Sequence, residues 1–218
     1  AVFEGGKMGR FFLNSLIITL PTVFGTLFLS SLAGYSLAMH RFKLNFLVFA
    51  MFIAGNFVPY QILMIPVRNI SIEMGMYNTH LGLIIFHIAF QTGFCTFFLR
   101  NFIKELPFEL IEAARADGAT EWLIYRKIIL PLIIPALAAL GVLEFTFIWN
   151  DYFWALVLTQ GDTVKPITIG LDVLRGQWTT SWNLVSAGSV VAALPPVIMF
   201  FILQKQFIQG LTFGAVKG

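Results

Sequence analysis

Residues 11–39 read FFLNSLIITLPTVFGTLFLSSLAGYSLAM, a stretch without a charged side chain. A helix needs about 20 mostly apolar residues to cross the hydrocarbon layer of a membrane, which is about 30 Å thick. This stretch is therefore long enough to cross the layer and to tilt or project beyond it. Because proline lacks a backbone N–H and clashes with the preceding turn, we expect a kink at Pro21.

Four more apolar runs follow in the chain. The composition agrees with this pattern, since 58% of the residues are hydrophobic, 11% are charged and the mean hydropathy is +0.82. A soluble domain has about 25% charged residues. The sequence therefore predicts an all-α integral membrane protein. Its five spans are expected at Phe11–Met39, Leu44–Pro66, Leu81–Leu99, Ile128–Trp149 and Val185–Leu203.

The distribution of Lys and Arg predicts the orientation, because cytoplasmic loops carry an excess of both. The segments after the first, third and fifth spans hold nine of the 14 basic residues: Arg41, Lys43, Arg100, Lys104, Arg115, Arg126, Lys127, Lys205 and Lys217. We therefore place the C-terminus in the cytoplasm and Ala1 outside. Since a protein of the cytoplasmic (inner) membrane usually begins inside, we expect a sixth span before Ala1. Lipid contact is implied, and no basic stripe suggests nucleic acid.

The longest inside segment, residues 100–127, reads RNFIKELPFELIEAARADGATEWLIYRK and predicts two short helices. Pro107 suits the first turn of a helix, and good helix formers follow it. Gly118 can adopt the left-handed conformation that closes a helix, and Thr120 is placed to cap the next one. We therefore expect a folded loop and not a flexible connector.

The composition of this loop suggests that it docks on another protein. Small side chains at Ala113, Ala114 and Ala116 allow another backbone to approach closely. We expect apolar anchors at Leu110, Ile111, Trp122 and Tyr125, and a charged edge at Glu109, Glu112 and Arg115. The alternative is an interfacial helix that lies on lipid headgroups.

The string EAARADGATEWLIYRKIILPLIIP resembles the EAA signature of binding-protein-dependent ABC transporter permeases. The matching positions are Glu112, Ala113, Ala114, Asp117, Gly118, Ala119, Ile128, Leu130, Pro131 and Pro135. The stretches FIWNDYFWALVL and FIQGLTFGAVKG resemble the carbohydrate branch, in particular the maltose-type second permease subunit. The resemblance covers nearly the whole chain from Asn14 to Gly218.

The resemblance implies a type I ABC importer transmembrane domain, with residues 1–218 as a single permease domain and a coupling loop at about 105–127. In that family the loop carries a coupling helix that sits in a groove of the ATPase, so Glu112, Ala113, Ala114, Asp117, Gly118 and Ala119 are the expected ATPase-coupling residues. The implied partners are a homologous second permease subunit, two ATP-binding cassette ATPase subunits and an extracytoplasmic solute-binding protein that delivers a sugar.

The sequence contains no phosphate-binding string of the form G-x-x-x-x-G-K-[ST], so ATP hydrolysis is expected on another chain. It has no nucleophile-elbow pattern, and His40, His80 and His87 show no metal-ligand spacing. We therefore expect a transport subunit without catalytic residues, cofactor or metal. His87 is expected to face the bundle and to find a partner on a neighbouring helix.

A carboxylate inside a span costs about 2.5 to 3.5 kcal/mol on insertion scales, so it usually faces a wet cavity or a partner. Glu144 is the only acid inside the five runs, and we take Glu144, Asn150 and Asp151 as candidates for the translocation pathway. The alternative is that Glu144 reaches the headgroups or bonds to the partner permease. Weaker candidates are Asn14, Asn56, Gln61 and Gln91.

Aromatic residues cluster near Glu144, and two interpretations remain open. Trp149, Tyr152, Phe153 and Trp154 either stack on sugar rings or belong to the aromatic belt of a membrane interface. The outside loop from Thr159 to Trp182 is polar and long enough to reach another protein. By resemblance we expect Gly176, Gln177 and Trp178 to contact the solute-binding protein.

Two other functional classes fit the apolar composition. One is a secondary transporter or channel that works without ATP, although such a protein would usually carry a second membrane-embedded repeat, which five spans cannot contain. The other is a structural membrane scaffold. Neither class would need the docking loop.

Overall fold

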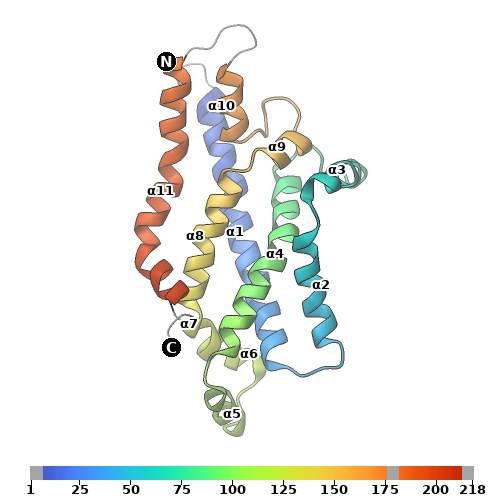
Figure 1. Cartoon of the computed structure of the whole chain (residues 1–218), viewed down its shortest axis with the longest axis vertical. Helices are drawn as coiled ribbons and strands as arrows, with labels where there is room; N and C mark the ends of the chain where they lie inside the picture. The colour runs from blue at the N-terminus through green and yellow to red at the C-terminus, as the bar shows by residue number, and fades with distance from the viewer. Residues whose placement is uncertain (1–6, 176–181, 213–218) are drawn as a thin grey trace. The chain divides into compact units, whose positions relative to one another are not determined.

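The computed structural model describes residues 7–175 and 182–212, which are largely helical and contain no strand (Figure 1). This confirms the predicted all-α class. The helices are α1 (Lys7–Met39), α2 (Asn45–Phe57), a 3-10 turn (Tyr60–Leu63), α3 (Met64–Glu73), α4 (His80–Lys104), α5 (Phe108–Ala116), α6 (Glu121–Ile124), a π-helical turn (Tyr125–Ile129), α7 (Leu130–Leu132), α8 (Ile134–Trp149), α9 (Phe153–Leu158), α10 (Ile167–Arg175) and α11 (Trp182–Thr212).

Among the described residues, three helices are long and apolar enough to cross a membrane, or up to five segments if each bent pair is one span. The three are α1, α4 and α11. The expected second span, Leu44–Pro66, is not one helix, because α2 ends at Phe57 and the chain bends by 91°. The expected fourth span, Ile128–Trp149, bends by 69° between α7 and α8. Each of these two expected spans is therefore a bent pair of helices.

Prolines lie at both bends. Pro59 precedes the 3-10 turn after α2, whereas Pro131 and Pro135 flank the break between α7 and α8. Proline donates no hydrogen bond and its ring clashes with the preceding turn. At 13 residues α2 is about 20 Å long, which is shorter than the hydrocarbon layer. Pro21, in contrast, lies inside an uninterrupted α1.

The chain divides into two compact units. The first contains Ala1–Phe24, Val58–Ala89 and Leu143–Ile202. Its tryptophan Trp149 is buried, packs edge-on against Phe12 at 5.5 Å and donates from its indole to the carbonyl of Ala192 at 2.9 Å. Trp149 thereby joins α1, α8 and α11 within this unit.

The second unit contains Gly25–Phe57, Phe90–Val142 and Leu203–Gly218. One apolar cluster forms its core, with buried members from α1, α4, α5, α6, the π-helical turn and α8. The members are Tyr35, Met39, Cys95, Leu99, Ile103, Ile111, Ile124, Tyr125, Ile129, Ile133, Ala136 and Leu140. The short helices of the loop thus share a core with the long apolar helices.

Glycines let the helices of the second unit approach closely. A Cβ on Gly93 of α4 would lie 2.7 Å from the carbonyl oxygen of Phe52 in α2, and no Cβ tolerates such a contact with backbone. A Cβ on Gly55, also in α2, would meet no other described atom within 4 Å.

We expect Gly93→Ala to destabilise the protein by about 1–3 kcal/mol, because α2 and α4 must separate to admit the methyl group. Gly55→Ala is the matched control and should leave the stability equal or slightly higher, since alanine favours a helix over glycine. Thermal unfolding of both variants in detergent measures the difference. Equal midpoints would contradict the close approach of the two helices.

Candidate functional site

The helix α5 presents one face to the core of the second unit and the other face outward. Ile111 is 1% exposed, whereas Phe108 and Leu110 on the same helix are about half exposed. Pro107 precedes the helix. Glu109 lies in its first turn and Arg115 in its last turn, and the helix dipole favours an acidic and a basic side chain at these respective ends. The helix is therefore amphipathic and anchored on one side.

A left-handed glycine ends α5. Gly118 has a φ of +78°, its N–H donates to the carbonyl of Arg115, and the N–H of Ala119 donates to that of Ala114, each at 3.0 Å. These two bonds form a Schellman motif, and Ala114 and Ala119 both pack on the core, as the motif favours. The prediction for Gly118 is confirmed.

The next helix starts as predicted. The N–H of Leu123 donates to the side-chain oxygen of Thr120 at 3.3 Å, and Thr120 has an extended backbone. This side chain therefore caps α6. Two turn signals, one glycine and one threonine, set the path of the chain between α5 and α6.

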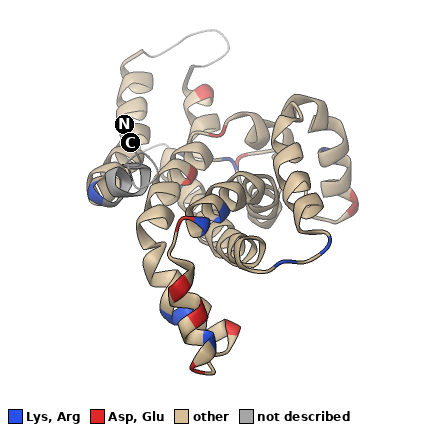
Figure 2. Ribbon diagram, turned by 60° about the horizontal axis from the view of Figure 1, so that its bottom comes forward, with Lys and Arg blue, Asp and Glu red and all other residues tan. Residues whose placement is uncertain are grey.

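The six expected coupling residues divide by exposure. Glu112, Ala113, Asp117 and Gly118 are exposed, whereas Ala114 and Ala119 are half-buried. Exposed apolar side chains surround the first four. We define the docking face as these four residues together with Phe108, Leu110, Trp122 and Leu123. Figure 2 shows acidic and basic residues along the same loop.

Two of the expected apolar anchors were wrong. Ile111 and Tyr125 are buried in the core of the second unit and cannot contact a partner, whereas Leu110 and Trp122 are exposed, Trp122 to 58%. Arg115, expected at a charged edge, turns instead toward Glu121, to which its Nε donates at 2.8 Å. This hydrogen bond raises the pKa of the Arg115 guanidinium above its ordinary value.

Sequence reasoning missed Glu121. Its carboxylate accepts from the hydroxyl of Tyr35 at 2.6 Å as well as from Arg115, and Nε2 of His40 lies 3.2 Å away. The partners come from α1, from α5 and from the residue that follows α1. No local pattern signals such a group, because Tyr35 and Glu121 are 86 positions apart.

The candidates for the translocation pathway do not form one cluster of exposed groups. Glu144 is 0% exposed, which contradicts the alternative that it reaches lipid headgroups. Asn150 is exposed, and its amide donates to the carbonyl of Thr146 on its own helix. Asp151 caps α9, since its carboxylate accepts from the N–H groups of Trp154 and Ala155 at 3.2 and 2.9 Å.

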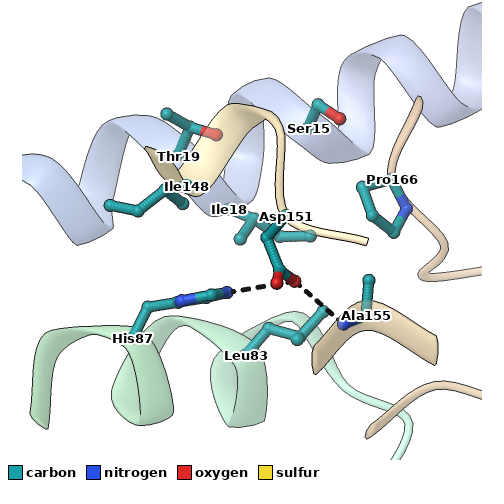
Figure 3. Close-up of a pocket in the computed structure, with 9 residues that line it drawn as sticks. All are labelled: Ser15, Ile18, Thr19, Leu83, His87, Ile148, Asp151, Ala155 and Pro166. Carbon is teal, nitrogen blue, oxygen red and sulfur yellow. Dashed lines mark hydrogen bonds and ion pairs between the residues drawn. The ribbon is translucent and has the colours of Figure 1, made fainter. Parts of the chain in front are cut away.

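Asp151 also borders a small polar pocket of the first unit (Figure 3). Nε2 of buried His87 lies 3.6 Å from its carboxylate, and Ser15 and Thr19 of α1 line the pocket. His87 therefore faces the bundle with a partner, as predicted. The pocket measures about 10 Å³, close to the space that a single water needs, and is too small for a sugar.

A larger open groove lies in the same unit, between α10 and α11. It measures about 430 Å³, and its polar lining includes Tyr152, Thr168, Asp172 and Ser189. The hydroxyl of Tyr152 donates to the carboxylate of Asp172 at 3.0 Å. Of these residues only Tyr152 was singled out from the sequence. We call this the outer groove.

The three expected binding-protein contacts, Gly176, Gln177 and Trp178, lie outside the described residues. The helices on either side, α10 and α11, form the outer groove. Close packing holds these two helices, because a Cβ on Gly188 of α11 would lie 3.0 Å from Leu171 and 3.1 Å from Leu174 of α10.

The chain thus combines helices long and apolar enough to cross a membrane with a folded loop that packs on the core of the second unit. Residues 27–213 match the family of the binding-protein-dependent transport system inner membrane component, and the chain belongs to this family. It is therefore a multi-pass membrane component of a transport system and not an enzyme. The match confirms the resemblance and decides against a secondary transporter, a channel or a scaffold.

Individual relatives agree with this assignment. The chain is 41% identical over 187 residues to a probable ABC transporter permease protein of Pyrococcus horikoshii, which covers 85% of the chain and 68% of the relative. It is 37% identical to the arabinooligosaccharides transport system permease protein AraQ of Halalkalibacterium halodurans, over 99% and 76% of the two chains. The fold resembles a bacterial ABC transporter involved in alginate import, with a TM-score of 0.81, 23% identity and coverage of 94% and 77%.

We expect Asp151→Ala to lower the stability by about 1 kcal/mol, because it removes the acceptor for two N–H groups at the start of α9. Asp151→Asn is the matched variant and should keep most of the stability, since asparagine also caps helices. The comparison uses thermal unfolding in detergent. If both variants lose the same stability, the charge beside His87 matters and the cap does not.

Proposed function

We propose that this chain is one of two permease subunits of an ATP-driven importer that moves a carbohydrate across the cytoplasmic membrane. A solute-binding protein delivers the sugar, a homologous permease forms the other half of the pathway, and two ATP-binding cassette ATPases supply the energy. The docking face is the observation that carries this proposal. It combines an exposed Glu112 and Gly118 with a loop fixed to the core of its unit.

The docking face suits a groove on an ATPase. Its small residues, Ala113 and Gly118, permit close backbone approach, while Trp122 and Leu110 offer apolar area at the edges. Glu112 and Asp117 add two exposed carboxylates that can pair with basic side chains. A lipid surface would favour basic residues over these acids on the exposed side.

Closure of the ATPase dimer on ATP then moves the two docking loops together. Because the loop shares a hydrophobic core with the long helices of its unit, its displacement passes to them. Alternation between two packings opens the pathway first outward and then inward. Hydrolysis on the ATPase chain resets the inward-facing packing.

The orientation follows from the distribution of basic residues. Nine of 14 fall in the segments after the first, third and fifth expected spans, which favours a cytoplasmic docking loop and C-terminus. By the same sequence reasoning, the segment from Thr159 to Trp182 is outside, where we propose that the binding protein docks. Gly176, Gln177 and Trp178 are the proposed contacts with it.

A carbohydrate is the favoured solute because relatives are named as sugar transport proteins. AraQ, for example, is named as an arabinooligosaccharides transport system permease protein. The outer groove has matching chemistry, since Tyr152 offers a ring face and Asp172 and Ser189 offer hydrogen-bond partners for hydroxyl groups. Glu144, Asn150 and Asp151 remain the proposed residues of the pathway itself. The groove would be the first contact for sugar leaving the binding protein.

Glu112→Lys and Gly118→Pro are expected to release the ATPase from the detergent-solubilised permease. The first variant reverses a charge on the docking face, and the second forces φ to about −65° where Gly118 needs +78°. Glu73→Lys, at the exposed end of α3, is the matched control and should retain the ATPase. Affinity capture followed by quantification of the ATPase measures the loss.

Retention of the ATPase by both docking-face variants would contradict the coupling role. Failure of the wild-type chain to retain any ATPase would contradict the proposal that ATPase subunits bind this chain.

Tyr152→Ala and Asp172→Ala should raise the KM of transport by about tenfold each, in line with the loss of one sugar stacking or charged hydrogen-bond contact. Uptake of a panel of radiolabelled sugars, including raffinose and lactose, into membrane vesicles that contain the whole transporter provides the measurement. Leu156→Ala, an exposed apolar residue of α9, is the control. An unchanged KM in both variants would remove the outer groove from the sugar route.

A further inference from the structure

Two hydrogen-bonded pairs connect α1 to the segment that follows the docking loop. The hydroxyl of Tyr35 donates to Glu121 at 2.6 Å, and the hydroxyls of Ser31 and Tyr125 lie 2.7 Å apart. Ser31 and Tyr35 are four residues apart on α1, and Glu121 and Tyr125 are four apart on the other segment. Residues with this spacing share a helix face. The two pairs therefore form a ladder between two helical faces.

Aromatic packing fills the space within the ladder. The rings of Tyr35 and Tyr125 lie 5.5 Å apart, and the Tyr125 ring stacks on Trp122 at 5.4 Å. Tyr35 and Tyr125 are both buried, whereas Trp122 belongs to the docking face. Trp122 is thus connected to α1 through the Tyr125 ring.

Glu121 also holds the docking helix itself. One carboxylate oxygen accepts from Arg115 of α5, and the other accepts from Tyr35 of α1. His40, which follows α1, lies 3.2 Å from the oxygen that Tyr35 uses. A single side chain at the start of α6 therefore contacts both the last turn of α5 and the end of α1.

The backbone beside this ladder is not a regular α-helix. Residues Tyr125–Ile129 form a π-helical turn directly after α6. Such turns insert one residue into a helix and often occur at functional sites. Glu121 lies one turn before the π-helical turn and Tyr125 is its first residue, and both contact α1.

We propose that Glu121 is a positioning residue that transmits displacement of the docking helix α5 to α1, through its simultaneous contacts with Arg115 and Tyr35. This inference rests on the proposed function and specifies the route of coupling within this subunit. Without Glu121 the docking face remains in place, since the Schellman turn and Ile111 hold it, but α1 no longer follows it.

The test measures whether α1 responds to nucleotide in the assembled transporter. A cysteine is introduced at Ser36, an exposed position in the last turn of α1 within the second unit, while the native Cys95 is buried. Its reaction rate with a maleimide is compared without nucleotide and with MgATP plus orthovanadate. The ATPase activity and the amount of ATPase retained are measured in the same preparations.

In the wild-type background we expect the labelling rate to change by about threefold or more on trapping, the factor that one net hydrogen bond makes in an equilibrium. In Glu121→Ala and Tyr35→Phe the change should disappear, while ATPase retention and ATP hydrolysis persist. Glu121→Gln keeps one acceptor oxygen and should restore part of the response. Glu73→Ala and Tyr77→Phe, both in the first unit, are matched controls.

Several outcomes overturn the inference. If the labelling rate of the wild type is the same with and without nucleotide, α1 does not respond. If Glu121→Ala shows the full change in labelling rate, the coupling takes another route. Release of the ATPase by Glu121→Ala makes Glu121 a docking residue. Absence of ATPase from the wild-type complex would instead contradict the proposed function.

Discussion

Hydrocarbon cannot hydrogen-bond to a peptide group, so each backbone N–H inside a membrane must find a partner within the protein. The long helices α1, α4 and α11 meet this requirement internally. Where the chain leaves helical geometry, side chains take over the task. Asp151 accepts from two N–H groups at the start of α9. In the docking loop, Thr120 accepts from one N–H group at the start of α6. The breaks in the helices are therefore as specifically built as the helices.

Three different features hold the docking loop against the core of the second unit. Gly118 closes α5 with a left-handed turn, Ile111 buries its side chain in the core, and Glu121 ties Arg115 to Tyr35. The proposed coupling role requires such fixation, since a flexible connector would absorb the displacement of its partner. Exposed acids and small residues on the outer side leave room for a protein groove.

Polar side chains in the first unit mostly connect elements to one another. The amide nitrogen of Asn14 donates to the carbonyls of Thr163 and Lys165, and its oxygen accepts from Nε2 of His80, so Asn14 connects the segment before α10 to α1 and α4. Asp151 bridges α9 and His87 in a similar way. Candidates chosen for a pathway because they are polar within apolar runs can thus be structural ties, which only the geometry reveals.

The sequence by itself determined the helical membrane class, the family and the turn at Gly118 with the cap at Thr120. Each of these depends on composition or on signals that act within about four residues. The tertiary structure decided which way side chains face, so that Ile111 and Tyr125 are buried and Trp122 is exposed. It also decided the partners of Glu121, because a contact across 86 positions depends on how α1 packs and leaves no local pattern.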